Sequence, residues 1–208
     1  MTEFYFVRHG KTQFNLERRF QGGQCDSPLL SESLRDAKKV GDYFKAQGQN
    51  FDAWYTSPQK RAWQTGKVIV DQLTQDLVAQ PLDGLREIEF GTWDGQKLAD
   101  FAGTADLKNY LEKPSQYDPA ANGGESYPEF LARANAALAE IYQQHPQGKV
   151  LISAHAVLIS FLTKSKIGIN LDAVRPAGLV ANTSVTVLKT DNFENFTMPV
   201  WNLTDFLK

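Results

Sequence analysis

The chain has 208 residues, of which 42% are hydrophobic and 22% are charged, and its formal net charge is −2. These values are typical of an ordinary globular protein, and we expect residues 1–208 to form one domain. A charge this close to neutral argues against nucleic acid or a membrane surface as a partner. The single cysteine excludes an intrachain disulfide, and no apolar run is long enough to span a bilayer, so the expected compartment is the cytoplasm.

The first predicted strand, Thr2–Val7, is a short apolar run that ends in Arg8, His9 and Gly10. A run of β-forming residues without polar alternation is typical of a strand buried on both faces. In an α/β protein, ligands bind in the loop at the carboxyl end of such a strand. A cation, an imidazole and a glycine in that loop therefore indicate a ligand site. The three residues alone would fit a capped strand end with a solvated arginine equally well.

Further along the chain, apolar spacing predicts alternating helices and buried strands. In chain order these are a helix at 31–47, a strand at 51–56, a helix from 57 to about 73, a poorer strand at 80–85, a helix at 127–144, a strand at 149–153 and a helix at 157–167. Two final strands, 184–190 and 196–201, turn around Asp191 and Asn192 and predict an antiparallel pair at the sheet edge.

Start signals are present at three of the predicted helices. Ser31 or Ser33 is expected to cap the first, and Ser57 followed by a proline is expected to start the second. Ser126 and Glu129 form a capping box before the third. The buried face of the first helix is predicted to carry Leu34, Ala37, Val40, Gly41 and Phe44.

The segment at about 92–125 has no clear periodicity and is interrupted by proline and glycine, with a helical stretch expected only at 97–111. An insertion of this length predicts a lid or binding loop over a site. The alternative is a surface excursion whose aromatic side chains seal the core. These aromatic residues are Trp93, Phe101, Tyr110 and Tyr117.

Five residues with useful chemistry are predicted to meet on one rim of the sheet. His9 and His155 each follow a buried strand, and the carboxyl ends of parallel strands share an edge. Arg61 lies in the first turn of a helix that begins at that edge. Arg8 and Glu87 are expected at the same edge. Arginines recognise oxyanions, so the predicted ligand is a phosphoryl group. A histidine can attack phosphorus, and a nearby carboxyl with a raised pKa can serve as acid and then base.

Signatures of competing chemistries are missing from the sequence. There is no His-Glu-x-x-His, no Gly-x-Ser-x-Gly and no Walker loop, and six positions beyond Cys25 stands Ser31 rather than the arginine that a cysteine phosphatase needs. We therefore predict no metal and no cofactor. Cys25 is interpreted as a small buried or half-buried residue, and His145 as a surface group at a helix end.

Four ordered blocks of the sequence resemble the histidine phosphatase superfamily, in its phosphoglycerate mutase-like branch. The resemblance covers nearly the whole chain. The four blocks are Val7 to Asn15, Ser57 to Thr65, Leu85 to Gly95 and Gly124 to Ser126.

The resemblance implies a three-layer α/β/α sandwich with a mostly parallel sheet and an antiparallel edge. It implies that His9 is the phosphorylated nucleophile and that Glu87 is the general acid and base. The residues implied to bind the phosphoryl group are Arg8, Asn15, Gln21, Gly22, Arg61 and His155. Glu89 matches no catalytic position and is interpreted as a satisfied or exposed carboxylate.

The sequence departs from the family pattern in places. Ala156 stands where a glycine is usual after the second histidine, one extra residue separates Gly22 from Asp26, and Leu30 and Ser33 replace a usual threonine and glycine. The preferred hypothesis is a phosphatase acting on a small phosphate ester whose leaving group has an apolar or ring portion. Alternatives are a phosphoglycerate mutase and a weakly active phospho-ligand-binding protein. A homodimer formed through the C-terminal edge strands is also possible.

Overall fold

The computed structural model describes the backbone of residues 1–208 and every side chain except that of Ala121. Across these residues six strands form one sheet in the order β3-β2-β4-β1-β5-β6. β1, β2, β3 and β4 run parallel, whereas β5 is antiparallel to β1 and to β6. The predicted mostly parallel sheet with an antiparallel edge is therefore confirmed. The strands are β1 (Thr2–Arg8), β2 (Ala53–Thr56), β3 (Ala79–Pro81), β4 (Gly148–Ala154), β5 (Val185–Thr190) and β6 (Phe196–Leu203).

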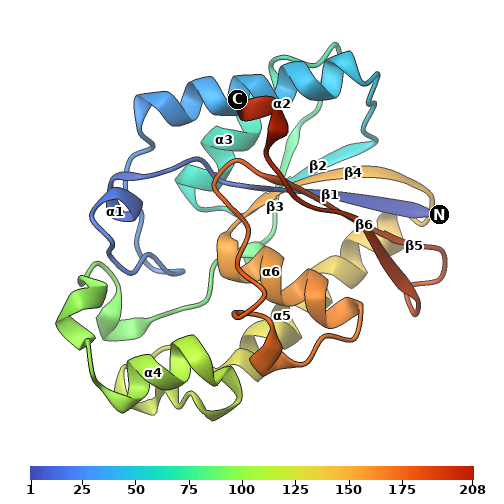
Figure 1. The fold of residues 1–208 in the computed structure, drawn as a ribbon. Helices are drawn as coiled ribbons and strands as arrows, with labels where there is room; N and C mark the ends of the chain where they lie inside the picture. The colour runs from blue at the N-terminus through green and yellow to red at the C-terminus, as the bar shows by residue number, and fades with distance from the viewer.

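Helices cover both faces of the sheet and give three layers (Figure 1). α2 (Ser31–Ala46) and α3 (Lys60–Val70) lie on one face, and α5 (Tyr127–Gln144) and α6 (Ala156–Lys166) lie on the other. α1 (Gln13–Leu16) and α4 (Ala105–Glu112) lie outside these layers, beyond the carboxyl end of β1. Among the described residues, no helix combines the length and apolarity that crossing a bilayer requires.

β1 is buried on both faces because its side chains alternate between two cores. Phe4 and Phe6 pack in the core beneath α5 and α6, whereas Tyr5 and Val7 pack with residues of α2 and α3. This is the physical reason for its uninterrupted apolar sequence: a strand between two helical layers has no solvent-facing side. The last residues of β1 therefore lie at the rim of the sheet, between the two helical layers.

The predicted serine caps of α2 and α3 are wrong. α2 follows Leu30 and α3 follows Gln59, and neither residue makes a side-chain cap hydrogen bond. Ser33 is instead buried and donates its hydroxyl to the carbonyl of Lys11 at 2.7 Å. The Oγ of Ser57 accepts the N–H of Gln59 at 3.3 Å, in a turn before the helix. Ser33 thus makes a tertiary contact, whereas Ser57 forms a local turn, and in neither case does the hydroxyl cap a helix.

Other elements match the prediction in part. The capping box of Ser126 and Glu129 starts α5 as predicted. The buried face of α2 carries the expected residues except Leu34, which is 42% exposed.

The predicted strand at 80–85 is shorter than expected, because residues 83–85 form a 3₁₀ turn after β3. Residues 97–111 are helical in two pieces, a 3₁₀ turn at Leu98–Phe101 and α4. Further 3₁₀ turns are Gly91–Trp93, Pro114–Gln116, Pro119–Ala121, Leu171–Ala173 and Asp205–Leu207.

The aromatic side chains of residues 92–125 pack into the core. Trp93, Tyr110 and Tyr117 are each less than 10% exposed, and their rings contact one another within 6.4 Å between centroids. Tyr110 also stacks on Tyr127 of α5 at 6.0 Å. These rings seal one end of the α5–α6 layer, as the alternative interpretation of this segment expects. Its role as a lid stays a prediction, as does pairing of β6 across a dimer.

Candidate active site

The two histidines that follow β1 and β4 lie side by side at the carboxyl end of the sheet. β1 and β4 are parallel neighbours with Arg8 opposite Ala154, so His9 and His155 leave the sheet together. Their ring centroids are 5.2 Å apart. His9 is 4% exposed and His155 is 0% exposed. Sheet topology thus brings together two imidazoles that are far apart in the sequence.

The ring of His9 is held in one orientation. Its Nδ1 lies 2.8 Å from the carbonyl oxygen of Gly10. Because a carbonyl can only accept, Nδ1 carries the hydrogen and the lone pair of Nε2 is left free. Burial and the positive charges of Arg61 and Arg8 lower the pKa of His9 well below its ordinary value of 6.5. The imidazole is therefore neutral at pH 7 with Nε2 free, which is the form that can act as a nucleophile.

Gly10 fits this position because its backbone is enclosed by two helices. Its N–H donates to the hydroxyl of Thr65 in α3 at 3.0 Å. A Cβ atom at Gly10 would lie 2.6 Å from the Cβ of Ser33 in α2. The two helices thus fix the loop that carries the His9 ring, and only glycine allows their close approach.

Arg61, in the first turn of α3, organises the loop at 21–26. Its Nη1 donates to the Cys25 carbonyl at 2.9 Å and to the Asp26 carboxylate at 3.1 Å. Its Nη2 donates to the carbonyls of Gln21 and Gly22 at 3.4 and 3.1 Å. The side chain is fully buried and pairs with the half-exposed Asp26. Arg61 therefore both shapes the loop and brings its charge to the histidines.

Four buried nitrogen atoms around the histidines have no hydrogen-bond partner among the described residues. They are Nε of Arg8, Nε of Arg61 and both ring nitrogens of His155. Buried polar atoms in proteins are nearly always paired, so a cluster of unpaired nitrogens indicates the binding place of an acceptor. Arg8 keeps its charge at neutral pH, since burial lowers its pKa only to about 10. The acceptor that fits two guanidiniums is an oxyanion.

Glu87 lies on the same rim and accepts three backbone N–H groups. Its Oε2 accepts from Val157 at 2.9 Å, and its Oε1 accepts from Leu158 at 3.0 Å and Ile88 at 3.1 Å. Two of these donors belong to the first turn of α6, so the carboxyl also caps this helix. Burial nevertheless raises the pKa of Glu87, against the lowering effect of the N–H donors and of Arg61. This rise is in the direction that a general acid requires.

Arg133 of α5 holds the segment that carries Glu87. Its Nη2 donates to the Glu87 carbonyl at 2.9 Å, and its Nη1 donates to the carbonyls of Gly84 and Arg86 at 3.1 and 2.9 Å. Its charge is balanced by Glu125, which accepts from Nε at 2.6 Å and from Nη2 at 2.8 Å. Sequence reasoning missed Arg133, because its contacts cross more than forty residues of chain.

Two amide side chains connect the loops of the rim, and sequence reasoning missed them as well. Gln59 donates to the Gly22 carbonyl at 2.7 Å and accepts the N–H of Glu87 at 3.1 Å. Asn182 donates to the carbonyl of His9 at 3.1 Å and to Oδ1 of Asn15 at 3.3 Å. Gln59 lies inside a matched family block and could have been found there. Asn182 has no local signal.

The remaining predicted residues make contacts within the loops. Oδ1 of Asn15 accepts the N–H of Thr12 at 3.2 Å, and Oε1 of Gln21 accepts the hydroxyl of Thr12 at 2.7 Å. The N–H of Gly22 donates to the carboxylate of Asp94 at 2.6 Å. Asp94 thus uses the backbone donor that phosphate was expected to meet, and a role of Gly22 in binding stays a prediction.

An open cavity of about 200 Å³ lies above the histidines. Five predicted site residues line it, whereas Arg61, His155 and Gly22 are not part of its described lining. Those five are Arg8, His9, Asn15, Gln21 and Glu87. The outer walls add Arg19, Arg175 and a set of apolar side chains, which are Phe20, Phe90, Leu98, Tyr110, Leu111, Ala156, Val157 and Leu179.

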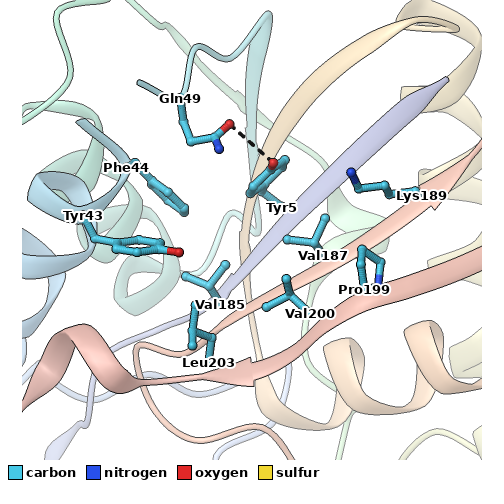
Figure 2. Close-up of a pocket in the computed structure, with 10 residues that line it drawn as sticks. All are labelled: Tyr5, Tyr43, Phe44, Gln49, Val185, Val187, Lys189, Pro199, Val200 and Leu203. Carbon is cyan, nitrogen blue, oxygen red and sulfur yellow. Dashed lines mark hydrogen bonds between the residues drawn. The ribbon is translucent and has the colours of Figure 1, made fainter. Parts of the chain in front are cut away.

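A second cavity, of about 160 Å³, lies between the end of α2 and the β5–β6 hairpin (Figure 2). Its walls are mainly aliphatic and aromatic, as Tyr43, Val187 and Val200 in Figure 2 illustrate. Its lining contains one cation, Lys189, which is already paired with Glu3 at 3.1 Å. Of the residues with unpaired nitrogens, Arg8 lines the first cavity and none lines this one.

Comparisons with known proteins show the family of this chain. The chain is 32% identical over 163 residues to a Bacillus subtilis (strain 168) protein described as uncharacterized phosphatase PhoE, with 78% of this chain and 76% of that protein covered. It is 29% identical over 175 residues to a probable phosphoglycerate mutase GpmB of Enterobacter sp. (strain 638), with 84% and 79% covered. The structure of Bacillus stearothermophilus YhfR matches over the full length of both chains at 28% identity, with a TM-score of 0.91. Because the family model of the histidine phosphatase superfamily (branch 1) also matches residues 4–204, this chain belongs to that superfamily.

Proposed function

We propose that this chain hydrolyses phosphate monoesters of small metabolites through a phosphohistidine on His9. The observation that carries the proposal is the set of four unpaired buried nitrogens of Arg8, Arg61 and His155 beside the free Nε2 of His9. A phosphoryl group supplies several acceptor oxygens and a negative charge at one point. It would accept from Nε of Arg8, from Nε of Arg61 and from the one ring N–H that a neutral His155 carries. The same donors would stabilise the charge that spreads over those oxygens in the transition state.

In the proposed first step, Nε2 of His9 attacks phosphorus and the bond from phosphorus to the ester oxygen breaks. Glu87 gives its proton to the departing oxygen, so the leaving group departs as an alcohol and the carboxyl becomes a carboxylate. The raised pKa of Glu87 supports its protonated starting form. The hydrogen on Nδ1 of His9 stays bonded to the Gly10 carbonyl, which stabilises the positive charge on the ring.

In the proposed second step, water attacks the phosphorus of phosphohistidine. The Glu87 carboxylate takes a proton from this water, and the bond from phosphorus to Nε2 of His9 breaks. Inorganic phosphate leaves, and both side chains return to their starting forms. The pair of steps replaces one difficult displacement by two easier ones and requires no other reactant than water.

The segment at 92–125 is proposed to cover the site within a single domain of residues 1–208. Leu98, Tyr110 and Leu111 come from this segment and line the cavity with His9. They would shield the reacting group from bulk water and contact the leaving group. The many apolar lining residues support a leaving group with an apolar or ring portion.

A phosphoglycerate mutase is the second candidate, and the 29% identity to a probable mutase supports it. Such an enzyme would use the same phosphohistidine but would return the phosphoryl group to a reoriented substrate. The difference lies in whether water or substrate meets phosphohistidine, and retention requires a site that excludes water.

The decisive experiment is an assay in the presence of EDTA on p-nitrophenyl phosphate and on 3-phosphoglycerate. Phosphate release without 2-phosphoglycerate is expected from the wild type, with activity undiminished by the chelator. His9→Ala is expected to abolish the release while the fold remains intact. Formation of 2-phosphoglycerate with little free phosphate would establish the mutase. Turnover by His9→Ala would overturn the nucleophile assignment.

A further inference from the structure

Arg175 lines the outer cavity from the segment between α6 and β5. Its Nε and Nη2 both donate to the hydroxyl of Tyr127, at 3.1 and 3.0 Å. Its guanidinium carbon lies 4.0 Å from the centroid of the Tyr110 ring. Two aromatic side chains therefore hold the guanidinium in a fixed plane at the wall of the cavity.

Like Arg8, and unlike three other arginines around the site, Arg175 has no carboxylate partner among the described residues. Arg61 is paired with Asp26, Arg133 with Glu125, and Arg19 with Glu17. The partners of Arg175 are a neutral phenol and a ring face. A partly buried cation whose charge is not balanced is costly to the folded protein, so it indicates an anion that binds there.

The segment around Arg175 is held in place from the protein side. Lys164, which is 3% exposed, donates to the carbonyls of Val174 and Gly178 at 3.0 and 2.8 Å. The carbonyl of Val180 accepts from Nη1 of Arg8 at 2.7 Å. The segment that carries Arg175 is thus bonded directly to a residue of the phosphoryl site. This connection fixes the separation between the two cationic places in the cavity.

We propose that Arg175 selects phosphate esters whose leaving group carries a carboxylate. This inference rests on the proposed function and names a substrate class for the same site. One planar guanidinium with part of its donors already used matches a singly charged planar anion. A second phosphoryl group carries about two charges, and recognition of the first one already takes two arginines and His155. The neighbouring apolar walls would contact the carbon chain between the two anions.

The test compares two esters that differ at one carbon, 3-phosphoglycerate and glycerol 3-phosphate. Arg175→Gln is expected to lower kcat/KM for 3-phosphoglycerate by about 10- to 100-fold, as loss of a charged hydrogen bond does, and for glycerol 3-phosphate by less than about threefold. Arg19→Gln is the matched control, since this arginine lines the same cavity but is ion-paired. It is expected to leave the ratio of the two values within about threefold of the wild type.

Structural effects of the substitution are separated by a second variant. Tyr127→Phe removes the hydroxyl that holds Arg175 but keeps the guanidinium, so preference for 3-phosphoglycerate is expected to persist even if the protein is less stable. An equal loss on both esters in Arg175→Gln would show that the residue is structural. The proposal would also be overturned if Arg175→Gln left the ratio of the two kcat/KM values unchanged. The same holds if only Arg19→Gln changed that ratio.

Binding without turnover separates this inference from the proposed function. In the His9→Ala background, the Kd of 3-phosphoglycerate measured by calorimetry is expected to rise about 10- to 100-fold when Arg175→Gln is added. An unchanged Kd would refute the role of Arg175 whatever the reaction. Failure of the wild type to turn over p-nitrophenyl phosphate would refute the phosphatase, while the calorimetric result would still decide the role of Arg175.

Discussion

His9 and His155 lie with their ring centroids 5.2 Å apart, both buried and both beside the charges of Arg8 and Arg61. Burial, followed by these charges, lowers the pKa of each ring well below its ordinary value of 6.5. The native protein therefore holds two neutral imidazoles in a cationic pocket. This arrangement suits His9 as a nucleophile and His155 as a neutral donor to a phosphoryl oxygen. It also makes the stability of the protein depend on pH.

The first prediction concerns stability at low pH. Below pH 6.5 the unfolded chain binds protons on His9 and His155 whereas the native protein does not, so the free energy of unfolding falls as pH falls. Each histidine contributes up to about 1.4 kcal/mol per pH unit. Glu87 acts in the opposite direction, because its raised native pKa makes the folded state bind a proton first as pH falls toward 4.5. Because two histidines lower the free energy of unfolding as pH falls and one carboxyl raises it, the net effect is a lower free energy of unfolding at low pH.

The measurement is urea unfolding at pH 7.5, 6.5 and 5.5 for the wild type and for His155→Asn. The variant is expected to lose less stability per pH unit than the wild type, by up to about 1.4 kcal/mol. Parallel pH dependences of the two proteins would contradict the assignment of a neutral buried imidazole to His155.

The second prediction concerns Glu87 as the acid. Glu87→Gln is expected to lower kcat on glycerol 3-phosphate by about 100-fold or more, because an alkoxide needs a proton to leave. The loss on p-nitrophenyl phosphate is expected to be smaller, since nitrophenolate leaves readily without one. The amide would also turn an N–H donor toward the backbone N–H of Val157, so the variant is expected to unfold at a lower temperature. The ratio of the two kinetic losses is insensitive to that effect, and equal losses would argue against Glu87 as the acid.

The third prediction concerns Arg133 as a positioning residue. Arg133→Gln removes donors from the carbonyls of Gly84, Arg86 and Glu87, and it is expected to lower the free energy of unfolding by about 1–3 kcal/mol. Because it acts through Glu87, its kinetic loss is expected to be larger on glycerol 3-phosphate than on p-nitrophenyl phosphate. A double variant with Glu87→Gln is expected to lose little more than Glu87→Gln alone. Fully additive kinetic losses would show that Arg133 does not act through Glu87.

The fourth prediction concerns phosphate as a ligand. Inorganic phosphate at 100 times its Kd is expected to stabilise the wild type by about 2.7 kcal/mol, seen as a rise in Tm. Arg8→Gln removes one of the unpaired nitrogens and is expected to reduce this rise, whereas Arg35→Gln on the exposed side of α2 is the control and is expected to preserve it. An equal rise in Arg8→Gln would show that phosphate binds elsewhere.

Sequence patterns predicted most of the fold because each signal was local. The uninterrupted apolar run of β1 reflects burial between two helical layers, and the capping box of Ser126 and Glu129 satisfies the N-terminal N–H groups of its own helix. The serines at the starts of α2 and α3 were misleading, because the same side chain can form a bond other than a helix cap. Ser33 donates to the distant carbonyl of Lys11, and Ser57 accepts the N–H of Gln59 in a local turn before α3, so neither hydroxyl caps a helix.

The sequence by itself determined the two strands that end in His9 and His155, the position of Arg61 in a first helical turn and the family blocks that contain them. Tertiary structure alone decided which nitrogens of these residues stay unpaired, and it recruited Asn182 and Arg175 to the site. Their contacts join segments far apart along the chain, which no periodicity or spacing encodes. Hydrogen-bond satisfaction and charge balance are properties of the packed whole, and they become readable only when every neighbour is in place.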